Sequence, residues 1–188
     1  MYDPYKSVTD SAQALALLKS GNERYVQNNL SAKGDYAAER AALAAGQHPF
    51  AIVLTCSDSR TAPEIFFDQK LGDIFVVRIA GNIAEPAGLG SIEYAAEHLK
   101  APLVAVVGHK KCGAVTAAYQ NADAHGNLKS VLDRIKPVCA SAKDEDEAVH
   151  LNVRRTVEQI KDNEVVKQNK VAVVGAYYDI ESGLVSWL

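Results

Sequence analysis

The segment Ala51-Ile-Val-Leu-Thr55 is a short, almost wholly apolar run that leads directly into the polar segment Cys56-Ser-Asp-Ser-Arg60. The same arrangement recurs where Leu103-Val-Ala-Val-Val107 leads into Gly108-His-Lys-Lys-Cys112. Apolar runs of this length are typical of strands buried on both faces of a parallel sheet. Because α/β sheets bind ligands beyond the carboxyl ends of their strands, the two polar segments are predicted to lie at a ligand-binding edge.

The rest of the chain alternates between strand-like and helix-like patterns. Strands are predicted at residues 50–55, 73–79, 102–108, 170–175 and 184–187. Helices are predicted from a cap at residues 9–11 to Asn28, at 37–45, 91–99, 112–120 and 130–141, and from 143 onward. Ser91 is expected to cap the helix that begins there, and Pro137 is expected to break the helix that contains it.

This alternation predicts a single α/β domain over residues 1–188. About four parallel strands and one antiparallel edge strand are expected to form a mostly parallel central sheet flanked by helices. Residues 1–46 are expected to form an N-terminal helical extension of that domain.

The acidic run Lys143-Asp-Glu-Asp-Glu147 allows two interpretations. It could form a metal or partner site, or it could be the first turn of a long helix, where the positive end of the helix dipole favours carboxylates. The residues Val149, Val153, Val157 and Ile160 follow at helical spacing. We therefore favour the start of an amphipathic helix with this buried stripe.

Length and composition restrict the classes of function. The 188 residues suffice for one domain, and 20 Lys and Arg against 23 Asp and Glu leave a net charge of −3. This balance offers no basic surplus for binding nucleic acid. No apolar run reaches the roughly 20 residues that cross a bilayer, so no membrane association is expected. The start Met1-Tyr-Asp-Pro-Tyr5 lacks a signal-peptide pattern, which predicts a cytoplasmic protein, with a leader trimmed from a longer precursor as the alternative.

Cys56, His109 and Cys112 form a candidate metal site. Adjacent parallel strands joined by right-handed crossovers bring their carboxyl ends together, which places Cys56 beside His109. Cys112 follows at the predicted start of a helix, where backbone N–H groups favour the thiolate. Two thiolates and one imidazole suit Zn²⁺ and leave a fourth position open, as in catalytic zinc sites. A buried structural role is the alternative for each residue alone, and Cys139 is expected to be a buried, inert thiol.

Asp58 and Arg60 lie in the same predicted loop as Cys56. A carboxylate beside a metal can coordinate it or accept a hydrogen bond from metal-bound water, and a guanidinium keeps that carboxylate ionised and directed. Asp58 turned toward Arg60 leaves the fourth metal position free, whereas Asp58 on the metal blocks it. A surface ion pair that caps the loop is the alternative.

The pattern Cys56-x-Asp58-x-Arg60, with His109-x-x-Cys112 further along the chain, resembles that of the β-class carbonic anhydrases. Similarity to that family also extends over residues 72–82, 91–95 and 174–179. The resemblance implies a zinc enzyme that interconverts CO₂ and bicarbonate. It assigns Cys56, His109 and Cys112 to the metal and makes Asp58 and Arg60 the catalytic pair.

The resemblance also implies a substrate pocket and an oligomer. The residues that it places in the pocket are Gln47, Phe75, Ala80, Tyr94 and Gly113. Ala80 stands where members of the family often carry a valine. The neighbouring subunit shares in the pocket, so a homodimer or a dimer of dimers is expected, with the arm of residues 1–46 packing on the partner subunit.

One subgroup of that family closes its site when bicarbonate occupies a second site, which contains a tryptophan three residues before the first cysteine. Val53 occupies that position here, and Trp187 is the only tryptophan in the chain. Arg78 matches the arginine of the second site, but one matching residue does not make the site. We therefore expect an enzyme without this bicarbonate switch.

The reaction that the resemblance implies is attack of zinc-bound hydroxide on CO₂, with the hydroxide oriented by Asp58 and Arg60. Phe75 and Ala80 would form apolar walls, and Gln47 could donate a hydrogen bond to the oxygen that becomes negative. Two alternatives remain open. One is a hydrolase of the same fold that acts on CS₂ or COS, and the other is a non-catalytic zinc- or redox-responsive protein with a disulfide between the site cysteines.

Overall fold

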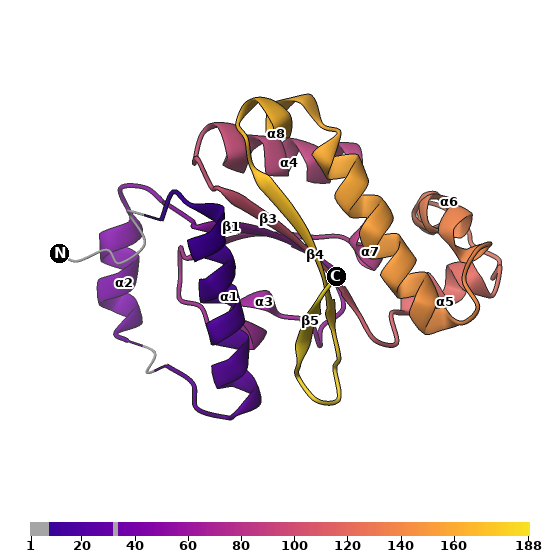
Figure 1. The fold of residues 1–188 in the computed structure, drawn as a ribbon, viewed down its shortest axis with the longest axis horizontal. Helices are drawn as coiled ribbons and strands as arrows, with labels where there is room; N and C mark the ends of the chain where they lie inside the picture. The colour runs from indigo at the N-terminus through magenta and orange to yellow at the C-terminus, as the bar shows by residue number, and fades with distance from the viewer. Residues whose placement is uncertain (1–7, 32–33) are drawn as a thin grey trace.

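A five-stranded sheet forms the centre of the computed structural model, which describes residues 8–31 and 34–188 (Figure 1). Its strands are β1 (Ala51–Thr55), β2 (Ile74–Arg78), β3 (Leu103–His109), β4 (Ala172–Tyr178) and β5 (Val185–Trp187). They lie in the order β2-β1-β3-β4-β5, with the first four parallel and β5 antiparallel to β4 at one edge. The predicted mostly parallel sheet with an antiparallel edge strand is confirmed.

Helices cover both faces of the sheet and complete a single-domain α/β fold (Figure 1). They are α1 (Ser11–Val26), α2 (Tyr36–Leu43), α3 (Pro63–Phe66), α4 (Pro86–Glu97), α5 (Gly113–Tyr119), α6 (Leu128–Cys139), α7 (Glu145–Lys161) and α8 (Glu164–Gln168), with a 3₁₀ turn η1 (Ala80–Asn82). α1 and α3 pack on one face, and α4, α7 and α8 pack on the other.

Successive residues of β3 serve two separate cores, because side chains alternate across a strand. Leu103, Ala105 and Val107 pack with α1 and α3. Val104 and Val106 pack with α4 and α7 on the opposite face. Burial on both faces requires a continuous apolar run, and this is why the strand is recognisable in the sequence.

Gly108 determines how closely α7 approaches the carboxyl end of β3. A Cβ on this residue would lie 2.5 Å from a methyl carbon of Val153 and 3.0 Å from one of Val149. Both valines belong to the buried stripe predicted for α7, and that stripe is confirmed. The backbone next to His109 is therefore in direct contact with the long helix.

The acidic run is the start of α7, as predicted. Asp144 is the N-cap residue, and its side chain accepts a hydrogen bond from the backbone N–H of Glu147. Three carboxylates then occupy the first turn, where the helix dipole favours negative charge.

The prediction that Ser91 caps α4 is wrong, because the helix begins at Pro86. The Glu85 side chain accepts hydrogen bonds from the backbone N–H groups of Ala87 and Gly88. Proline suits the first helical position because the N–H that it lacks would have no partner there. Ser91 lies inside the helix, where its hydroxyl donates to the carbonyl of Ala87 at 2.9 Å.

The prediction that Pro137 breaks its helix is also wrong, because α6 runs through it to Cys139. Pro137 lies in the last turn, and the carbonyl that loses an N–H partner belongs to the exposed residue Asp133. Water can hydrate that carbonyl. Buried contacts of Leu132 and Ile135 with the neighbouring helices hold α6 in place.

Three short elements were not predicted: α3, α8 and η1. Each contains too few residues to show a hydrophobic period. β4 also extends to Tyr178, beyond the predicted end at 175, because its last residues pair with β5.

The N-terminal region contributes one helix to the core. Asp10 caps α1 through a hydrogen bond from Ala12 N, and Ala14 and Leu18 are buried against the sheet of the same chain. Every residue of α2 is exposed or half-buried. Residues 1–7, which include the segment Met1–Tyr5, and residues 32–33 lie outside the described part. Among the residues described, no helix is long and apolar enough to cross a membrane.

Candidate metal centre

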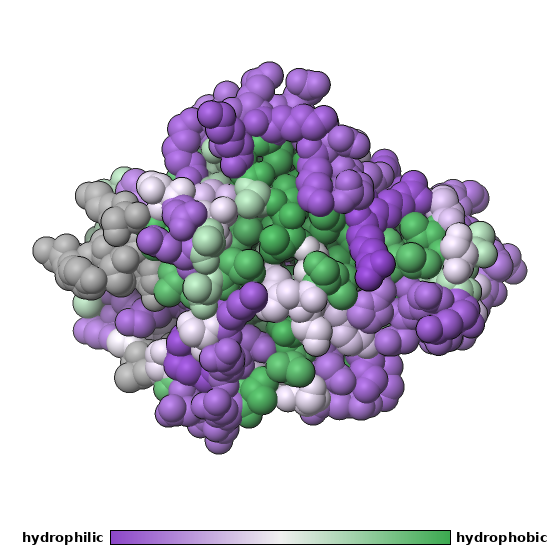
Figure 2. Space-filling model, viewed as in Figure 1, coloured by the Kyte–Doolittle hydropathy of each residue, from purple (hydrophilic) through white to green (hydrophobic). Residues whose placement is uncertain are grey.

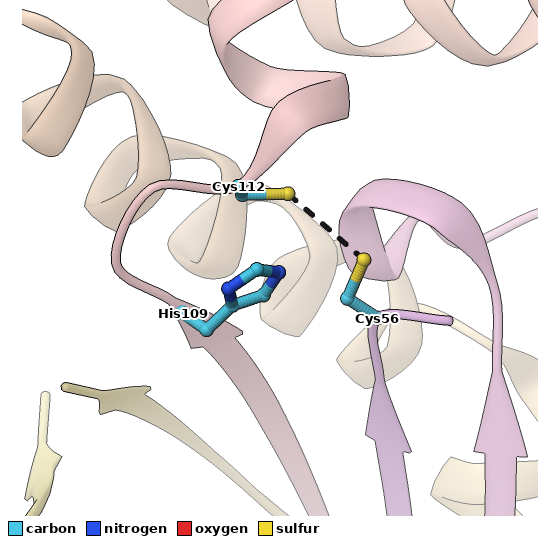
Figure 3. Close-up of side chains that lie close together, drawn as sticks. All are labelled: Cys56, His109 and Cys112. Carbon is cyan, nitrogen blue, oxygen red and sulfur yellow. Dashed lines mark hydrogen bonds between the residues drawn. The ribbon is translucent and has the colours of Figure 1, made fainter. Parts of the chain in front are cut away.

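Three potential metal ligands converge at the carboxyl edge of the sheet (Figure 3). Cys56 follows β1, His109 ends β3, and Cys112 is the N-cap residue of α5. β1 and β3 are neighbours in parallel register, with Thr55 opposite Val107, so the residues after them meet. The ligand atoms of the three side chains all lie within 4.8 Å of one another, as the sequence predicted.

The His109 ring is fully buried and oriented by its own loop. Its Nδ1 lies 3.0 Å from the Lys110 carbonyl, which can only accept, so Nδ1 carries the proton. Nε2 is then a bare acceptor, and it is buried without a hydrogen-bond partner among the described residues. An unsatisfied buried acceptor costs about 1–3 kcal/mol, and a metal ion would satisfy it.

The two cysteine sulfurs lie 4.0 Å apart and share a hydrogen bond. This separation is about twice the 2.05 Å of a disulfide, so both thiols are free in this structure. The hydrogen bond from Cys112 lowers the pKa of Cys56 to about 4 against the opposing effect of burial, and the backbone N–H of Gly81 acts in the same direction as Cys112. The same hydrogen bond, together with burial, raises the pKa of Cys112. A nearby dication would favour loss of that second proton.

This donor set fits zinc. Two sulfurs bound to a tetrahedral zinc at about 2.3 Å stand about 3.8 Å apart, close to the separation observed here. The Nδ1–H hydrogen bond leaves Nε2 free to coordinate, which is the usual way a metal-bound histidine is oriented. Three protein ligands leave one position for water or substrate.

Asp58 is held by Arg60 through three hydrogen bonds. The guanidinium donates to both carboxylate oxygens, at 2.9 Å and 2.7 Å, and the Arg60 backbone N–H donates at 2.9 Å. This guanidinium holds the pKa of Asp58 well below its usual range. Asp58 Oδ2 lies 3.9 Å from His109 Nε2, so the carboxylate borders the point where the three ligands converge.

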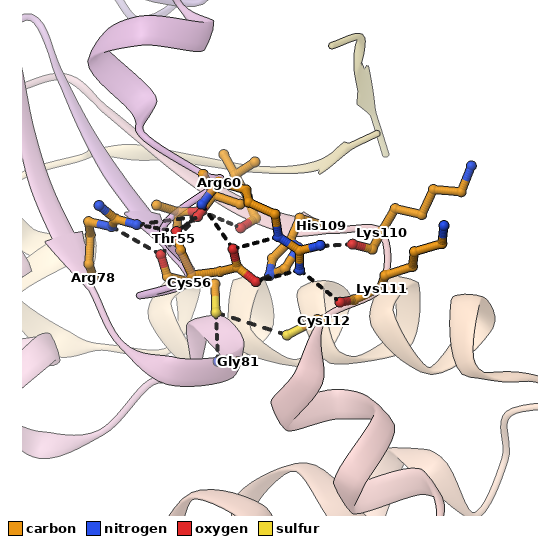
Figure 4. Close-up of polar contacts among 12 residues, drawn as sticks. Thr55, Cys56, Arg60, Arg78, Gly81, His109, Lys110, Lys111 and Cys112 are labelled. Carbon is orange, nitrogen blue, oxygen red and sulfur yellow. Dashed lines mark hydrogen bonds and ion pairs between the residues drawn. The ribbon is translucent and has the colours of Figure 1, made fainter. Parts of the chain in front are cut away.

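Three side chains fix the loop that carries Cys56 and Asp58. Thr61 donates to the carbonyls of Cys56 and Asp58, at 3.0 Å and 2.9 Å. Arg78, from the end of β2, donates to the same two carbonyls (Figure 4). Arg60 reaches across to the Lys111 carbonyl at 3.3 Å, which ties this loop to the segment between the other two ligands.

The predicted pocket residues divide into two groups. Ala80 and Gly113 adjoin the centre: Ala80 precedes Gly81, whose N–H donates to the Cys56 sulfur, and Gly113 follows Cys112. A Cβ on Gly113 would meet no described atom within 4 Å, so open space lies beside it.

The other three predicted pocket residues lie away from the metal centre of their own chain: Gln47, Phe75 and Tyr94. Gln47 is exposed before β1, and the rings of Phe75 and Tyr94 lie 6.3 Å apart on β2 and α4. Phe75 pairs with Ile52, four residues before Cys56, which corresponds to about 13 Å along the sheet.

Sequence reasoning did not assign Gly81 or Thr61 a role, and it considered Arg78 only for a second bicarbonate site. Gly81 N–H donates to the Cys56 sulfur at 3.3 Å, from a turn in which Gly81 has φ +68°. A Gly-Asn pair shortly after a strand is a recognisable turn signal, and it marks this turn in the sequence.

Comparison with known proteins identifies one family. The family model described as carbonic anhydrase matches residues 51–185. Carbonic anhydrase 2 of Mycobacterium tuberculosis is 38% identical over 189 residues, covering 93% of this chain and 91% of the relative. A carbonic anhydrase of Mycolicibacterium smegmatis is 38% identical over 182 residues, covering 89% and 88%.

Solved structures show the same fold. A tetrameric β-carbonic anhydrase from Sordaria macrospora has a TM-score of 0.73 at 27% identity, covering 81% of this chain and 89% of that one. The β-carbonic anhydrase CafA of Aspergillus fumigatus has a TM-score of 0.72 at 27% identity, covering 94% and 89%. A carbon disulfide hydrolase, at 18% identity and a TM-score of 0.58, shares the fold alone.

Proposed function

The chain belongs to the carbonic anhydrase family, and on that premise we propose that it catalyses the reversible hydration of CO₂ to bicarbonate and a proton. We further propose that Cys56, His109 and Cys112 hold one catalytic Zn²⁺. The observation that carries this proposal is the buried Nε2 of His109, which has no hydrogen-bond partner in the described part of the chain, on a ring whose ligand atom lies within 4.8 Å of both cysteine sulfurs.

Zinc, when bound, supplies the Lewis acidity that makes a water molecule a nucleophile near neutral pH. The protein contributes the direction of attack. Asp58 stays ionised beside Arg60 and can only accept hydrogen bonds, so it would orient the attacking oxygen by accepting a hydrogen bond from the O–H that this oxygen retains. The three hydrogen bonds from Arg60 would hold Asp58 as a neighbour of the metal and not as a ligand, so that the fourth coordination position would be left to the reactants.

A second copy of the chain completes the pocket in this proposal. Phe75 and Tyr94 form a partly exposed aromatic pair that lies far from the centre of their own chain, which fits a role in the site of a partner subunit. CO₂ offers little to hydrogen-bond, so aromatic and aliphatic walls suit it. Gln47, exposed before β1, would donate to the oxygen that becomes negative.

The surface supports a homodimer or a dimer of dimers. Figure 2 shows apolar side chains gathered on the face between α1 and α7, over β4. The first residues of β4 are only half-buried, and Leu184 and Leu188 are 49% and 44% exposed. Contiguous apolar patches of this kind typically mark association surfaces. We propose that this face and the exposed helix α2 of the N-terminal arm contact other subunits.

The test is stopped-flow CO₂ hydration on protein whose zinc content has been measured, with CS₂ and COS assayed in parallel. We expect fast hydration by protein with one zinc per chain and no comparable hydrolysis of CS₂ or COS. Fast hydrolysis without hydration would instead identify the hydrolase. If neither reaction occurs and mild oxidation expels the zinc while linking Cys56 to Cys112, the protein is a redox-responsive one and the proposal is wrong.

A further inference from the structure

Asn152 is a polar residue on the buried face of α7, and only 2% of it is exposed. Its neighbours on that face include Val149 and Val153. A buried amide in an apolar stripe is costly unless it is hydrogen-bonded. The Asn152 side chain donates to the Gly81 carbonyl at 2.7 Å, and this partner belongs to η1, 71 residues away in the sequence.

The turn that Asn152 holds is the one that contacts a metal ligand. The backbone N–H of Gly81 donates to the Cys56 sulfur at 3.3 Å (Figure 4). Gly81 and Asn82 both have positive φ, 68° and 44°, a conformation that costs a non-glycine residue about 1–2 kcal/mol. Such a turn persists only where its surroundings hold it.

Helix α7 is placed to do this by the glycine at the end of β3. The absence of a Cβ on Gly108 lets Val153 and Val149 approach its backbone closely, and Asn152 precedes Val153 on the same helix. The packing of α7 on β3 therefore fixes the position of Asn152 and with it the hydrogen bond to Gly81.

We propose that Asn152 is a positioning residue for the metal centre. By holding the Gly81 carbonyl, it keeps the Gly81 N–H aimed at the Cys56 sulfur, and that hydrogen bond withdraws charge from the thiolate and makes the bound metal a stronger Lewis acid. Hydrogen bonds to ligand atoms tune metal sites in this way and affect activity or metal affinity about 10- to 100-fold. This inference rests on the proposed zinc site.

The test compares Asn152→Leu with Thr156→Val. Leucine has the same branching of its heavy atoms as asparagine, with two larger methyl groups in place of the amide, and it cannot donate to Gly81. Thr156 is equally buried, at 2%, and lies one turn further along α7, so its replacement controls for loss of a buried polar group on this helix. Both variants are loaded with Co²⁺, and the thiolate-to-cobalt charge-transfer band is recorded together with kcat and KM of the zinc forms.

We expect Asn152→Leu to move the charge-transfer band to lower energy, because a thiolate without its hydrogen bond is a better electron donor. We expect kcat to fall about tenfold with KM unchanged. Thr156→Val should match the wild type in both respects. An unmoved band in Asn152→Leu, or equal changes in both variants, would overturn the inference.

A second measurement covers the case in which Asn152→Leu does not fold. In the zinc-loaded wild type, hydrogen exchange of the Gly81 amide should be strongly protected, and exchange at the rate of a free amide would overturn the inference. Failure of the proposed function has a different signature, since it would appear as a zinc-loaded wild type without CO₂ hydration. The cobalt spectra do not depend on the reaction.

Discussion

Asp58 receives hydrogen bonds from three nitrogens of one neighbour, Arg60: Oδ1 accepts two of them and Oδ2 accepts one, so Oδ2 can accept a second. The guanidinium keeps its pKa well below the ordinary range, so this carboxylate does not act as an acid. Its contribution is an ionised acceptor in a fixed direction, bordering the point where Cys56, His109 and Cys112 converge.

Replacement of Asp58 by asparagine should therefore remove catalysis without removing the metal. The asparagine side chain would have the same shape but would carry an N–H₂ group where an acceptor is needed, so kcat/KM should fall about 10²- to 10⁴-fold while zinc content stays at the wild-type level. Stopped-flow hydration and metal analysis measure both. The control is Asp133→Asn, which changes an exposed aspartate paired with Lys129 on α6. Undiminished activity in Asp58→Asn would remove the role assigned to this residue.

At the scale of single residues, the sequence predicts those that sit at strand ends and misses those that act through backbone atoms. Cys56 and His109 follow apolar runs, so sheet topology brings them together without further information. Gly81 contributes only an N–H group, and Thr61 contributes a hydroxyl to two carbonyls. Neither contact can be predicted from the residue type alone, because each depends on which backbone or sulfur atom the fold brings near.

Among the elements, the segment between His109 and Cys112 is tied to the turn that joins β4 and β5. Glu181 accepts from Lys110 at 2.7 Å and from Lys111 at 2.6 Å, and Lys110 also contacts Asp179. The two lysines lower the pKa of Glu181 to about 2. The carbonyls of this segment accept hydrogen bonds from the His109 ring and from Arg60. The position of the segment therefore affects the orientation of both side chains.

Glu181→Gln should loosen this segment. Because exposed ion pairs are weak, zinc release to a chelator should become only about two- to fivefold faster at low ionic strength. The difference from wild type should shrink in high salt, which screens the pairs. Glu158→Gln, which removes an exposed pair with Lys161 on α7, is the matched control. Equal release rates at low salt for all three proteins would contradict the account.

The contact between α1 and α3 depends on Gly21. A Cβ there would lie 1.8 Å from the carbonyl oxygen of Phe67, and that oxygen is part of the backbone and cannot rotate away. Gly21→Ala should therefore lower the free energy of unfolding by about 3 kcal/mol. Gly90→Ala, in α4, is the opposite case, because a Cβ there meets no described atom within 4 Å, and it should stabilise by about 0.5–1 kcal/mol.

Urea unfolding of both glycine variants measures these changes. A neutral Gly21→Ala would show that α1 does not pack on its own chain as described, whereas a destabilising Gly90→Ala would place that residue in an interface.

Element types are more predictable than element boundaries in this chain. Continuous apolar runs predict the buried strands, and periodic apolar residues predict the long helix α7. The start of α4 depends on Glu85 and Pro86, a side-chain cap whose hydrogen bonds become visible only in three dimensions. The effect of Pro137 is hard to predict because it depends on whether water can reach one particular carbonyl.

For the whole molecule, the central expectation is that each pocket draws on two chains. This gives a complementation test with Asp58→Asn and Tyr94→Ala. A mixed dimer contains one site with both changes and one site with neither. Random mixing of unfolded or dissociated chains should thus restore about a quarter of the wild-type sites.

Each variant alone should have low CO₂ hydration activity, because every one of its sites carries a change. The activity of the mixture should exceed the mean of the two separate activities. Light scattering should give a native mass of at least a dimer. A mixture no more active than its separate components, or a fully active monomer, would contradict the shared pocket.

The most direct test of the zinc-dependent hydration of CO₂ is isotopic exchange of oxygen between CO₂ and water, measured as a function of zinc bound per chain. The exchange rate should rise in proportion to zinc occupancy, vanish when a chelator removes the metal, and return when zinc is restored. Cys112→Ser should fail to recover it. A protein that holds one zinc per chain, yet exchanges oxygen no faster than buffer, would contradict the account.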